Sequence, residues 1–328
     1  MKNYITFTLF CFTFLTNSLL AQINDSKEGY GKSNSDTAWV SPIKNVPEIA
    51  QYETYATPAR GTNTIGSYMI YLPKEYSNTK KKYPVIYYLH GGKGDQSESA
   101  WFMKIMNDSI NSGKMSPVII VGVQALPIGW YCNANVGAEG VISGPVEDVI
   151  IKNLIPHIDK KYRTIANYRG RGLEGWSMGG FGALRLAFKY PKMFGFASSI
   201  AGAVIDFTDE HNPQYLSNTF GPTEGEAAAA SIAYFNAVHP KTYAQQNKVL
   251  IQKNVKVRLV VGKKDWLYDN KGKLITQNFS NYLSSLGIKN EYIPIDNIGH
   301  MLPQSFEKKE VNYPLTFWTN AFKRDKNK

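Results

Sequence analysis

The chain has 328 residues, of which 43% are hydrophobic and 19% charged. These proportions are typical of a globular protein, and they exclude a chain that is mostly disordered or coiled coil. The mean hydropathy of −0.31 excludes a polytopic membrane protein. The formal net charge is +11, but the Lys and Arg residues are scattered apart from runs at 80–82 and 323–328, and no nucleic-acid-binding motif accompanies them. We therefore interpret the charge as a generally basic surface and expect no nucleic-acid partner.

Residues 1–21 have the pattern of a secretory signal peptide. Lys2 gives a positive start, an apolar run covers 5–15, and Ala21 precedes a polar segment. The alternative is a membrane anchor, but the run is short and rich in threonine, so we expect export and no stable membrane insertion. Removal of this segment would leave Cys132 as the remaining cysteine, which excludes an internal disulfide.

The rest of the chain divides into an arm and a domain. Residues 22–50 are polar and rich in Gly, Ser and Pro, and we predict a linker or a loosely attached arm. From 51 to 325, strand-like and helix-like segments alternate. Runs of β-branched and aromatic residues predict strands at 66–73, 83–90, 116–124, 193–202, 255–262 and 291–296. Helices are predicted at 146–162 with a kink or break at Pro156, after the turn at 175–180, and before Gly287.

This alternation predicts an α/β domain with a mostly parallel central sheet and helices on both faces. Residues 203–254 interrupt the alternation, and we predict an insertion there with a helix near 227–230. Insertions after the carboxyl end of a strand commonly build the substrate-binding surface of an α/β protein, so we expect this segment to do so.

The clearest chemical signal is a G-x-S-x-G motif around Ser177, within the sequence GWSMGG at 175–180. A short predicted strand precedes the motif and a helix rich in small residues follows it, which is the context of a nucleophile elbow. Such a turn places the serine oxygen at a helix N-terminus, where backbone amides favour negative charge. The alternative is a glycine-rich turn with an inert serine. We predict that Ser177 is a nucleophile.

A serine hydroxyl is a weak nucleophile, so it needs a histidine base and a carboxylate that orients the histidine. In α/β-hydrolases the acid and then the histidine follow the serine along the chain. His300 follows the predicted strand 291–296, whereas His211 and His239 lie in the predicted insertion. We therefore predict that His300 is the base.

The carboxylate has three candidates. Asp265 lies closest to the end of the predicted strand 255–262, and it is our prediction for the acid. Asp269 follows it and remains an alternative. Asp296 is a further alternative, although we expect it to end the strand that leads to His300.

An acyl-transfer site also needs N–H donors for the oxyanion. One should be the amide of Met178, the residue after the nucleophile, and the other should come from the loop after the strand that ends at His90. We predict Gly92 as the second donor, with Gly91 as a close alternative.

Five aromatic residues lie near the predicted mouth of the site. These residues are Trp101, Trp130, Tyr131, Trp176 and Trp266. Their side chains could stack on an aromatic acyl group or a sugar ring of the substrate, or they could instead pack the loops. No cluster has the spacing of metal ligands, and no loop has a dinucleotide- or phosphate-binding pattern. We expect neither a metal nor another cofactor, and we interpret Cys132 as a small buried residue rather than a second nucleophile.

Several of these segments resemble the esterase-D-like branch of the α/β-hydrolases. That branch includes carbohydrate esterases of family 1 (feruloyl and acetylxylan esterases), S-formylglutathione hydrolases, siderophore esterases and mycolyltransferases. The resemblance extends over roughly 50–320 and is carried by LHGGKGDQSESAW (89–101), LIPHIDKKYRTI (154–165), GWSMGGFGALRLAFKYP (175–191), GKKDWLY (262–268) and GH (299–300). It implies the α/β-hydrolase fold and assigns the family triad and the oxyanion donors to Ser177, Asp265, His300, Met178 and Gly92. Two features depart from the family, because Trp176 replaces a residue that is often small or aliphatic, and 203–254 matches nothing that names a substrate.

By this resemblance, together with the export expected from residues 1–21, we expect a serine esterase that removes feruloyl or acetyl groups from plant polysaccharide through an acyl-enzyme. Other ester substrates remain open, such as a siderophore, a lipid or a polyester, and so does acyl transfer. A non-catalytic glycan-binding protein on the same fold is the alternative from another class. The sequence does not predict the oligomeric state.

Overall fold

The computed structural model describes residues 39–135, 144–206, 213–269, 271–300 and 313–322. The predicted signal peptide and the first part of the predicted arm lie outside these residues. Among the described helices, none combines the length and the apolar character that crossing a membrane requires.

Eight strands form one twisted sheet in the order β1-β2-β4-β3-β5-β6-β7-β8. β2 is antiparallel to both of its neighbours, and the pairs from β4 onward are parallel. The mostly parallel sheet expected from the sequence is therefore confirmed. The strands are β1 (Ala50–Ala56), β2 (Ile65–Tyr71), β3 (Val85–Leu89), β4 (Ile119–Val123), β5 (Arg171–Trp176), β6 (Phe196–Ile200), β7 (Lys256–Gly262) and β8 (Asn290–Ile295).

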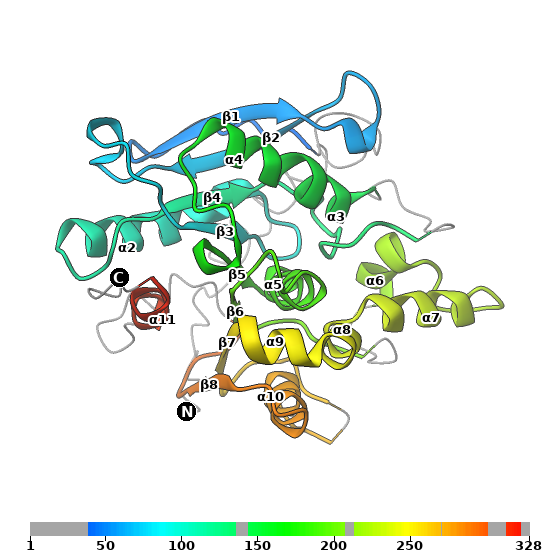
Figure 1. Cartoon of the computed structure of the whole chain (residues 1–328). Coiled ribbons are helices and arrows are strands. Elements are labelled where there is room, and N and C mark those ends of the chain that lie inside the picture. Colours follow the sequence, from blue (N-terminus) through cyan, green and yellow to red (C-terminus); the bar gives the residue numbers. More distant parts are fainter. Residues whose placement is uncertain (1–38, 136–143, 207–212, 270, 301–312, 323–328) are drawn as a thin grey trace, which may run out of the picture.

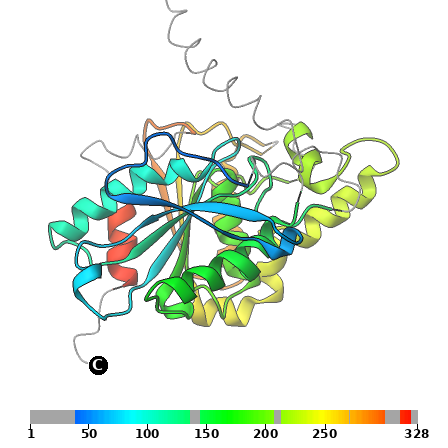
Figure 2. The same ribbon diagram turned by 90° about the horizontal axis from the view of Figure 1, so that it is seen from above.

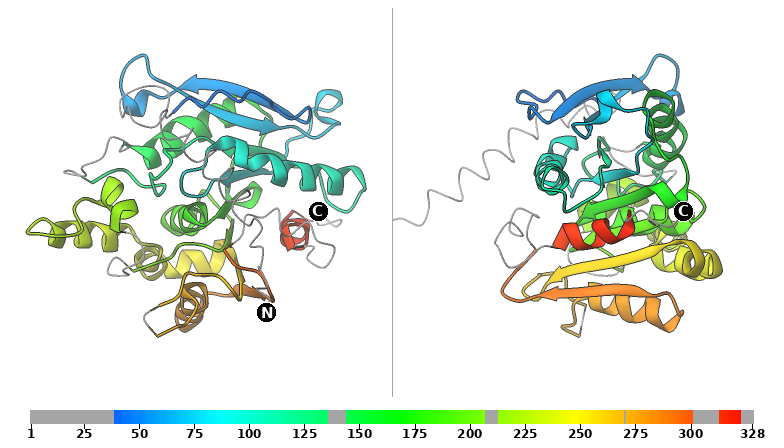
Figure 3. Two further views of the ribbon diagram at one scale, coloured as in Figure 1. Left: turned by 180° about the vertical axis from the view of Figure 1, so that it is seen from behind. Right: turned by 60° about the vertical axis from the view of Figure 1, so that its left-hand side comes forward.

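Helices cover both faces of the sheet (Figures 1 and 2). One face packs against α2 (Ala100–Asn111) and α11 (Tyr313–Ala321), which lie together in the two views of Figure 3. The other face packs against α3 (Val146–Asp148), α4 (Ile155–Lys161), α5 (Met178–Lys189), α8 (Pro240–Gln246), α9 (Lys248–Asn254) and α10 (Ile275–Ser285). Short 3-10 turns η2 (Pro58–Arg60), η3 (Tyr76–Asn78), η4 (Gln96–Ser99) and η6 (Tyr168–Gly170) connect these elements.

The central strand β3 shows why these runs are apolar throughout. All five of its residues are buried, and their side chains alternate between the two faces of the sheet. Tyr87 belongs to the core under α5, whereas Ile86 and Tyr88 belong to the core under α2. A strand covered by helices on both sides therefore needs large apolar residues at every position.

The edge of the sheet differs from the expectation. β1 was not predicted, because an edge strand with mostly half-exposed side chains lacks a clear apolar pattern.

The described part of the predicted arm, 39–49, is packed against the domain rather than loosely attached. Trp39 is 2% exposed, and its carbonyl oxygen accepts a hydrogen bond from Ser67 N–H at 2.9 Å. Arg60 lies over the Trp39 ring at 4.6 Å.

The helix predicted over 146–162 is helical from Val146 to Lys161, but its middle is π-helical. The π-helical segment, η5 (Val149–Leu154), lies between α3 and α4, and the residues at both junctions keep right-handed helical φ and ψ. Pro156 lies next to the end of this segment, where its ring and its missing N–H disturb the ordinary helical hydrogen bonds. The structure therefore shows a π-helical segment before Pro156 and not the break that the sequence offered as one possibility.

The predicted insertion at 203–254 is shorter in the structure. α6 (Pro213–Phe220) and α7 (Ala228–Val238) project beyond the sheet (Figure 1), and α7 begins close to the expected position. Residues 240–254 instead form α8 and α9, which return to the sheet and lead into β7. Tyr243 and Ile251 are buried in the same core as α5. The predicted insertion was too long because α8 and α9 have only seven residues each, too few to show a clear apolar periodicity.

Candidate active site

Ser177 occupies a sharp turn between β5 and α5. Its backbone has φ 54° and ψ −115°, a conformation that is strained for a residue with a side chain. A Cβ atom on Gly175 would lie 2.2 Å from the carbonyl oxygen of Gly179, and one on Gly179 would lie 2.0 Å from that of Leu89. Both glycines of the motif are therefore required for the close approach of the chain, and the turn presents Ser177 at the N-terminus of α5.

Ser177, His300 and Asp265 form one hydrogen-bonded chain. His300 Nε2 lies 2.9 Å from Ser177 Oγ, and His300 Nδ1 lies 3.0 Å from each carboxylate oxygen of Asp265. Asp265 is fully buried, and its Oδ1 also accepts the N–H of Leu267 at 2.9 Å. With the imidazole proton on Nδ1 toward Asp265, Nε2 is left to accept the proton of the serine hydroxyl.

Topology explains why these distant residues meet. They follow the carboxyl ends of β5, β7 and β8, which run parallel and end at the same edge of the sheet. The structure thus places Ser177, Asp265 and His300 together, as the predicted arrangement requires.

The alternative candidates lie elsewhere. Asp269 accepts hydrogen bonds from the backbone of Lys271 and Lys273 in its own loop. Asp296 pairs with Lys263 at the surface. His239 is buried beside α8, and His211 lies outside the described residues.

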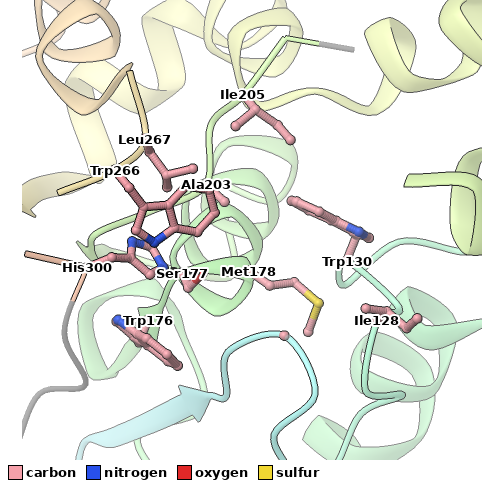
Figure 4. A pocket seen from close by; sticks show the side chains of 11 residues that line it. Ile128, Trp130, Trp176, Ser177, Met178, Ala203, Ile205, Trp266, Leu267 and His300 are labelled. Atoms are coloured by element: carbon pink, nitrogen blue, oxygen red, sulfur yellow. Dashed lines mark hydrogen bonds between the residues drawn. The ribbon is translucent and has the colours of Figure 1, made fainter. Parts of the chain in front are cut away.

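A cavity of about 230 Å³ opens onto the serine and the histidine. In Figure 4, Trp176, Trp266 and His300 lie on one side of Ser177, and Trp130 lies on the other side. Apart from Ser177, His300 and Gly92, its walls are apolar side chains, from Ile128, Trp130, Trp176, Met178, Ala203, Ile205, Trp266 and Leu267. Such a site suits an apolar group of substantial size.

The two residues predicted to supply oxyanion donors both line the cavity. Met178 is the first residue of α5, so its N–H has no acceptor within the helix. Gly92 lines the cavity. The N–H of Gly91 is already occupied, because it donates to the carboxylate of Glu98 at 3.1 and 3.2 Å. This contact favours Gly92 over Gly91 as the second donor.

The predicted aromatic residues do not all line the cavity. Trp130, Trp176 and Trp266 do, and Trp266 is 48% exposed with its ring centroid 4.9 Å from that of His300. Trp101 does not, which corrects the prediction, because it lies on the face of α2 that packs against the sheet. It is 6% exposed there. Tyr131 is fully buried and is not among the residues that line the cavity.

Sequence reasoning missed several residues that shape the site. Ile128, Ile205 and Leu267 are cavity residues that carry no chemical motif, although Leu267 neighbours the predicted Trp266. Arg185 was missed as well, and its buried guanidinium donates at 3.0 Å to the carbonyl oxygen of Tyr131. That contact holds a loop in which Trp130 and Tyr131 both have positive φ, so the strained backbone that places Trp130 at the cavity is held in position.

The described residues support neither a metal site nor a cysteine nucleophile. They contain no group of three or more His, Cys, Asp or Glu side chains arranged to hold a metal ion. Cys132 is fully buried, and burial raises the pKa of its thiol to about 11. A buried thiol with a raised pKa is a poor nucleophile.

A family model, Esterase, described as "Putative esterase", matches residues 62–282. This chain belongs to the Esterase family. An esterase of Mycobacterium tuberculosis is 37% identical over 159 residues, which are 48% of this chain and 33% of that protein. An endo-1,4-beta-xylanase/feruloyl esterase of Xylanibacter ruminicola is 30% identical over 161 residues, 46% of this chain and 21% of that protein. The chain thus spans a third or less of the length of these two relatives.

Solved structures show the same fold. A ferulic acid esterase superposes with a TM-score of 0.62 at 21% identity, covering 83% of this chain and 99% of that chain. An S-formylglutathione hydrolase from Staphylococcus aureus superposes with a TM-score of 0.58 at 15% identity, covering 78% and 94%. The α/β-hydrolase fold and the resemblance to the esterase-D-like esterases, both expected from the sequence, are confirmed.

Proposed function

We propose that this member of the Esterase family hydrolyses carboxylic esters through an acyl-enzyme. The observation that carries the proposal is the hydrogen-bonded chain from Asp265 through His300 to Ser177, which ends at an apolar cavity. Nucleophile, base and orienting carboxylate occur there in the geometry of a serine hydrolase triad. A non-catalytic glycan-binding protein has no need for the strained backbone of Ser177.

The proposed reaction has two halves. Ser177 Oγ attacks the ester carbonyl while His300 Nε2 takes the hydroxyl proton, and Asp265 stabilises the imidazolium that forms. The N–H groups of Met178 and Gly92 bind the oxyanion of the tetrahedral intermediate. His300 then protonates the departing alcohol, leaving an acyl group on Ser177. Water, deprotonated by His300, attacks this acyl group and releases the acid.

For the acyl group we propose feruloyl or a related aromatic acid rather than acetyl. The apolar wall formed by Ile128, Trp130 and Ile205 can enclose an aromatic ring, whereas an acetyl group would fill little of a cavity of about 230 Å³. The relative from Xylanibacter ruminicola, named a xylanase/feruloyl esterase, also supports this choice.

For the alcohol we propose a sugar of a plant polysaccharide. The half-exposed ring of Trp266 lies beside His300, the residue that protonates the departing alcohol, so a sugar leaving there could stack on it. Export of the enzyme, proposed from residues 1–21, would bring it to such a polymer.

Turnover of a short p-nitrophenyl ester tests the reaction. Ser177→Ala should lower kcat by about 10⁴-fold or more, since removing the nucleophile of a triad removes most of its catalysis. Ser77→Ala, at an exposed serine in η3, is the matched control and should equal the wild type. Equal rates for Ser177→Ala and the wild type would overturn the mechanism.

A panel of methyl ferulate, acetylated xylan and a long-chain ester tests the substrate. We expect the highest kcat/KM with methyl ferulate. A preference for acetylated xylan or the long-chain ester would contradict the aromatic acyl group and leave the serine mechanism standing.

A further inference from the structure

The loop that supplies the second oxyanion donor is fixed through Gly91. The carbonyl oxygen of Gly91 accepts the N–H of Gly94 at 3.1 Å, and His90 Nδ1 lies 2.8 Å from the same oxygen. The ring of Trp176 packs against the Cα atom, because a Cβ there would lie 2.3 Å from Trp176 Cε3. The N–H of Gly91 donates to the Glu98 carboxylate. Every polar group of this residue is therefore engaged.

These contacts determine where the next amide points. A trans peptide is planar, and its C=O and N–H groups point in opposite directions. The carbonyl oxygen of Gly91 and the N–H of Gly92 belong to one peptide. Holding Gly91 on both its N–H and its C=O side thus fixes the direction of the Gly92 N–H, and Gly92 borders the cavity with Ser177.

Glu98 is the charged member of this arrangement. Its Oε1 also accepts the hydroxyl of Tyr88 at 2.8 Å, and that hydroxyl accepts the indole N–H of Trp101 at 3.3 Å. Burial raises the pKa of Glu98 to about 7, and Asp95 adds to this, while the hydrogen bonds from Tyr88 and Gly91 oppose it. These donors are arranged to hold a carboxylate, and a buried charge is retained only when it is hydrogen-bonded.

We propose that Glu98 is a positioning residue for the oxyanion site, which anchors Gly91 so that the N–H of Gly92 is aimed at the carbonyl attacked by Ser177. The inference rests on the proposed function and adds a residue that never touches the substrate. Its contribution appears in the transition state, because the oxyanion exists only there. Trp101, which we predicted to bind substrate, contributes through Tyr88 instead.

Glu98→Ala and Glu98→Gln test the proposal at about pH 8, where the carboxyl group is ionised. Loss of one oxyanion donor lowers kcat by about 100-fold in other enzymes, and we expect a similar fall for Glu98→Ala with KM little changed. Glu98→Gln keeps one acceptor for the Gly91 N–H and should retain about tenfold more kcat than Glu98→Ala. Affinity for an arylboronic acid, which forms a tetrahedral adduct with an active serine, should fall in parallel with kcat/KM.

Glu53→Gln is the matched control. Glu53 lies on β1, forms an ion pair with Lys161 of α4, and does not line the cavity. Both its kcat and its boronate affinity should equal those of the wild type. If Glu98→Ala does not fold, Glu98→Gln decides the test. Wild-type kcat and boronate affinity in a folded Glu98 variant would overturn the inference and leave the Ser177 mechanism intact. Failure of that mechanism would show separately, as full turnover by Ser177→Ala.

Discussion

His239 makes the stability of the fold sensitive to acid. It is 3% exposed, and its ring contacts those of Phe181 and Phe235, with centroid distances of 5.5 and 5.2 Å. Nδ1 accepts the N–H of Lys241 as the cap of α8, which leaves Nε2 to donate to the carbonyl oxygen of Ile205 at 3.1 Å. Both ring nitrogens are therefore used by the neutral imidazole, and a second proton on Nδ1 would break the cap.

The size of the effect follows from the change in pKa. Burial, with a smaller effect from the nearby Lys241 charge, lowers the pKa of His239 from 6.5 to about 4. Between these values the unfolded chain binds the proton and the folded chain does not, so the free energy of unfolding falls as the pH decreases. The stabilisation from this residue is complete above about pH 6.5. Roughly 3 kcal/mol of it is lost by pH 4 and below.

Urea unfolding from pH 7 to pH 4 measures this loss, with His239→Asn as the comparison. Asparagine can still cap α8 through its side-chain oxygen but does not titrate. The variant should be less stable at pH 7 by about 2 kcal/mol or more, for the lost bond to Ile205 and the lost packing against Phe181 and Phe235. Its stability should depend less steeply on pH. Parallel pH dependences for the two proteins would refute the assignment.

Three further substitutions test other parts of the structure. Trp266→Ala should raise KM for a feruloylated arabinoside about threefold to tenfold and change KM for methyl ferulate less, because Trp266 borders the cavity for both substrates but only the first carries a sugar to stack on it. Equal effects on both substrates would contradict this role. Arg185→Met should lower the free energy of unfolding by about 3 kcal/mol in urea, because the buried Glu147 loses one of its two cationic partners and the carbonyl oxygens of Tyr131 and Val238 lose their donor. An unchanged midpoint would show that these contacts are dispensable. Gly179→Ala should lower the free energy of unfolding by more than about 2 kcal/mol, because the new Cβ would clash with the Leu89 carbonyl oxygen. A Tm equal to that of the wild type would contradict this clash.

The triad was predictable because its signals are local. Ser177 lies in a motif whose glycines are dictated by steric contact, and Asp265 and His300 each follow a recognisable strand. Parallel strands bring their carboxyl ends to one edge, and β5, β7 and β8 lie within four neighbouring strands of the sheet, so the three side chains come together.

The rest of the site depends on which way side chains face. Trp101 is close to the oxyanion loop along the chain, yet the face of α2 that carries it packs against the sheet. Glu98 and Arg185 act by hydrogen-bonding backbone atoms of other segments, and such partners leave no motif. The cavity residues Ile128 and Ile205 are ordinary apolar residues until the fold places them beside Ser177.

The acyl-enzyme itself is the most direct test of the account. The protein would be mixed with a p-nitrophenyl ester, quenched in acid within the first turnover, and analysed by intact mass and peptide mapping. We predict one acyl group per chain, located on Ser177, and none on Ser177→Ala. Release of p-nitrophenol with no acyl group on Ser177, or with the acyl group on another residue, would contradict the central claim.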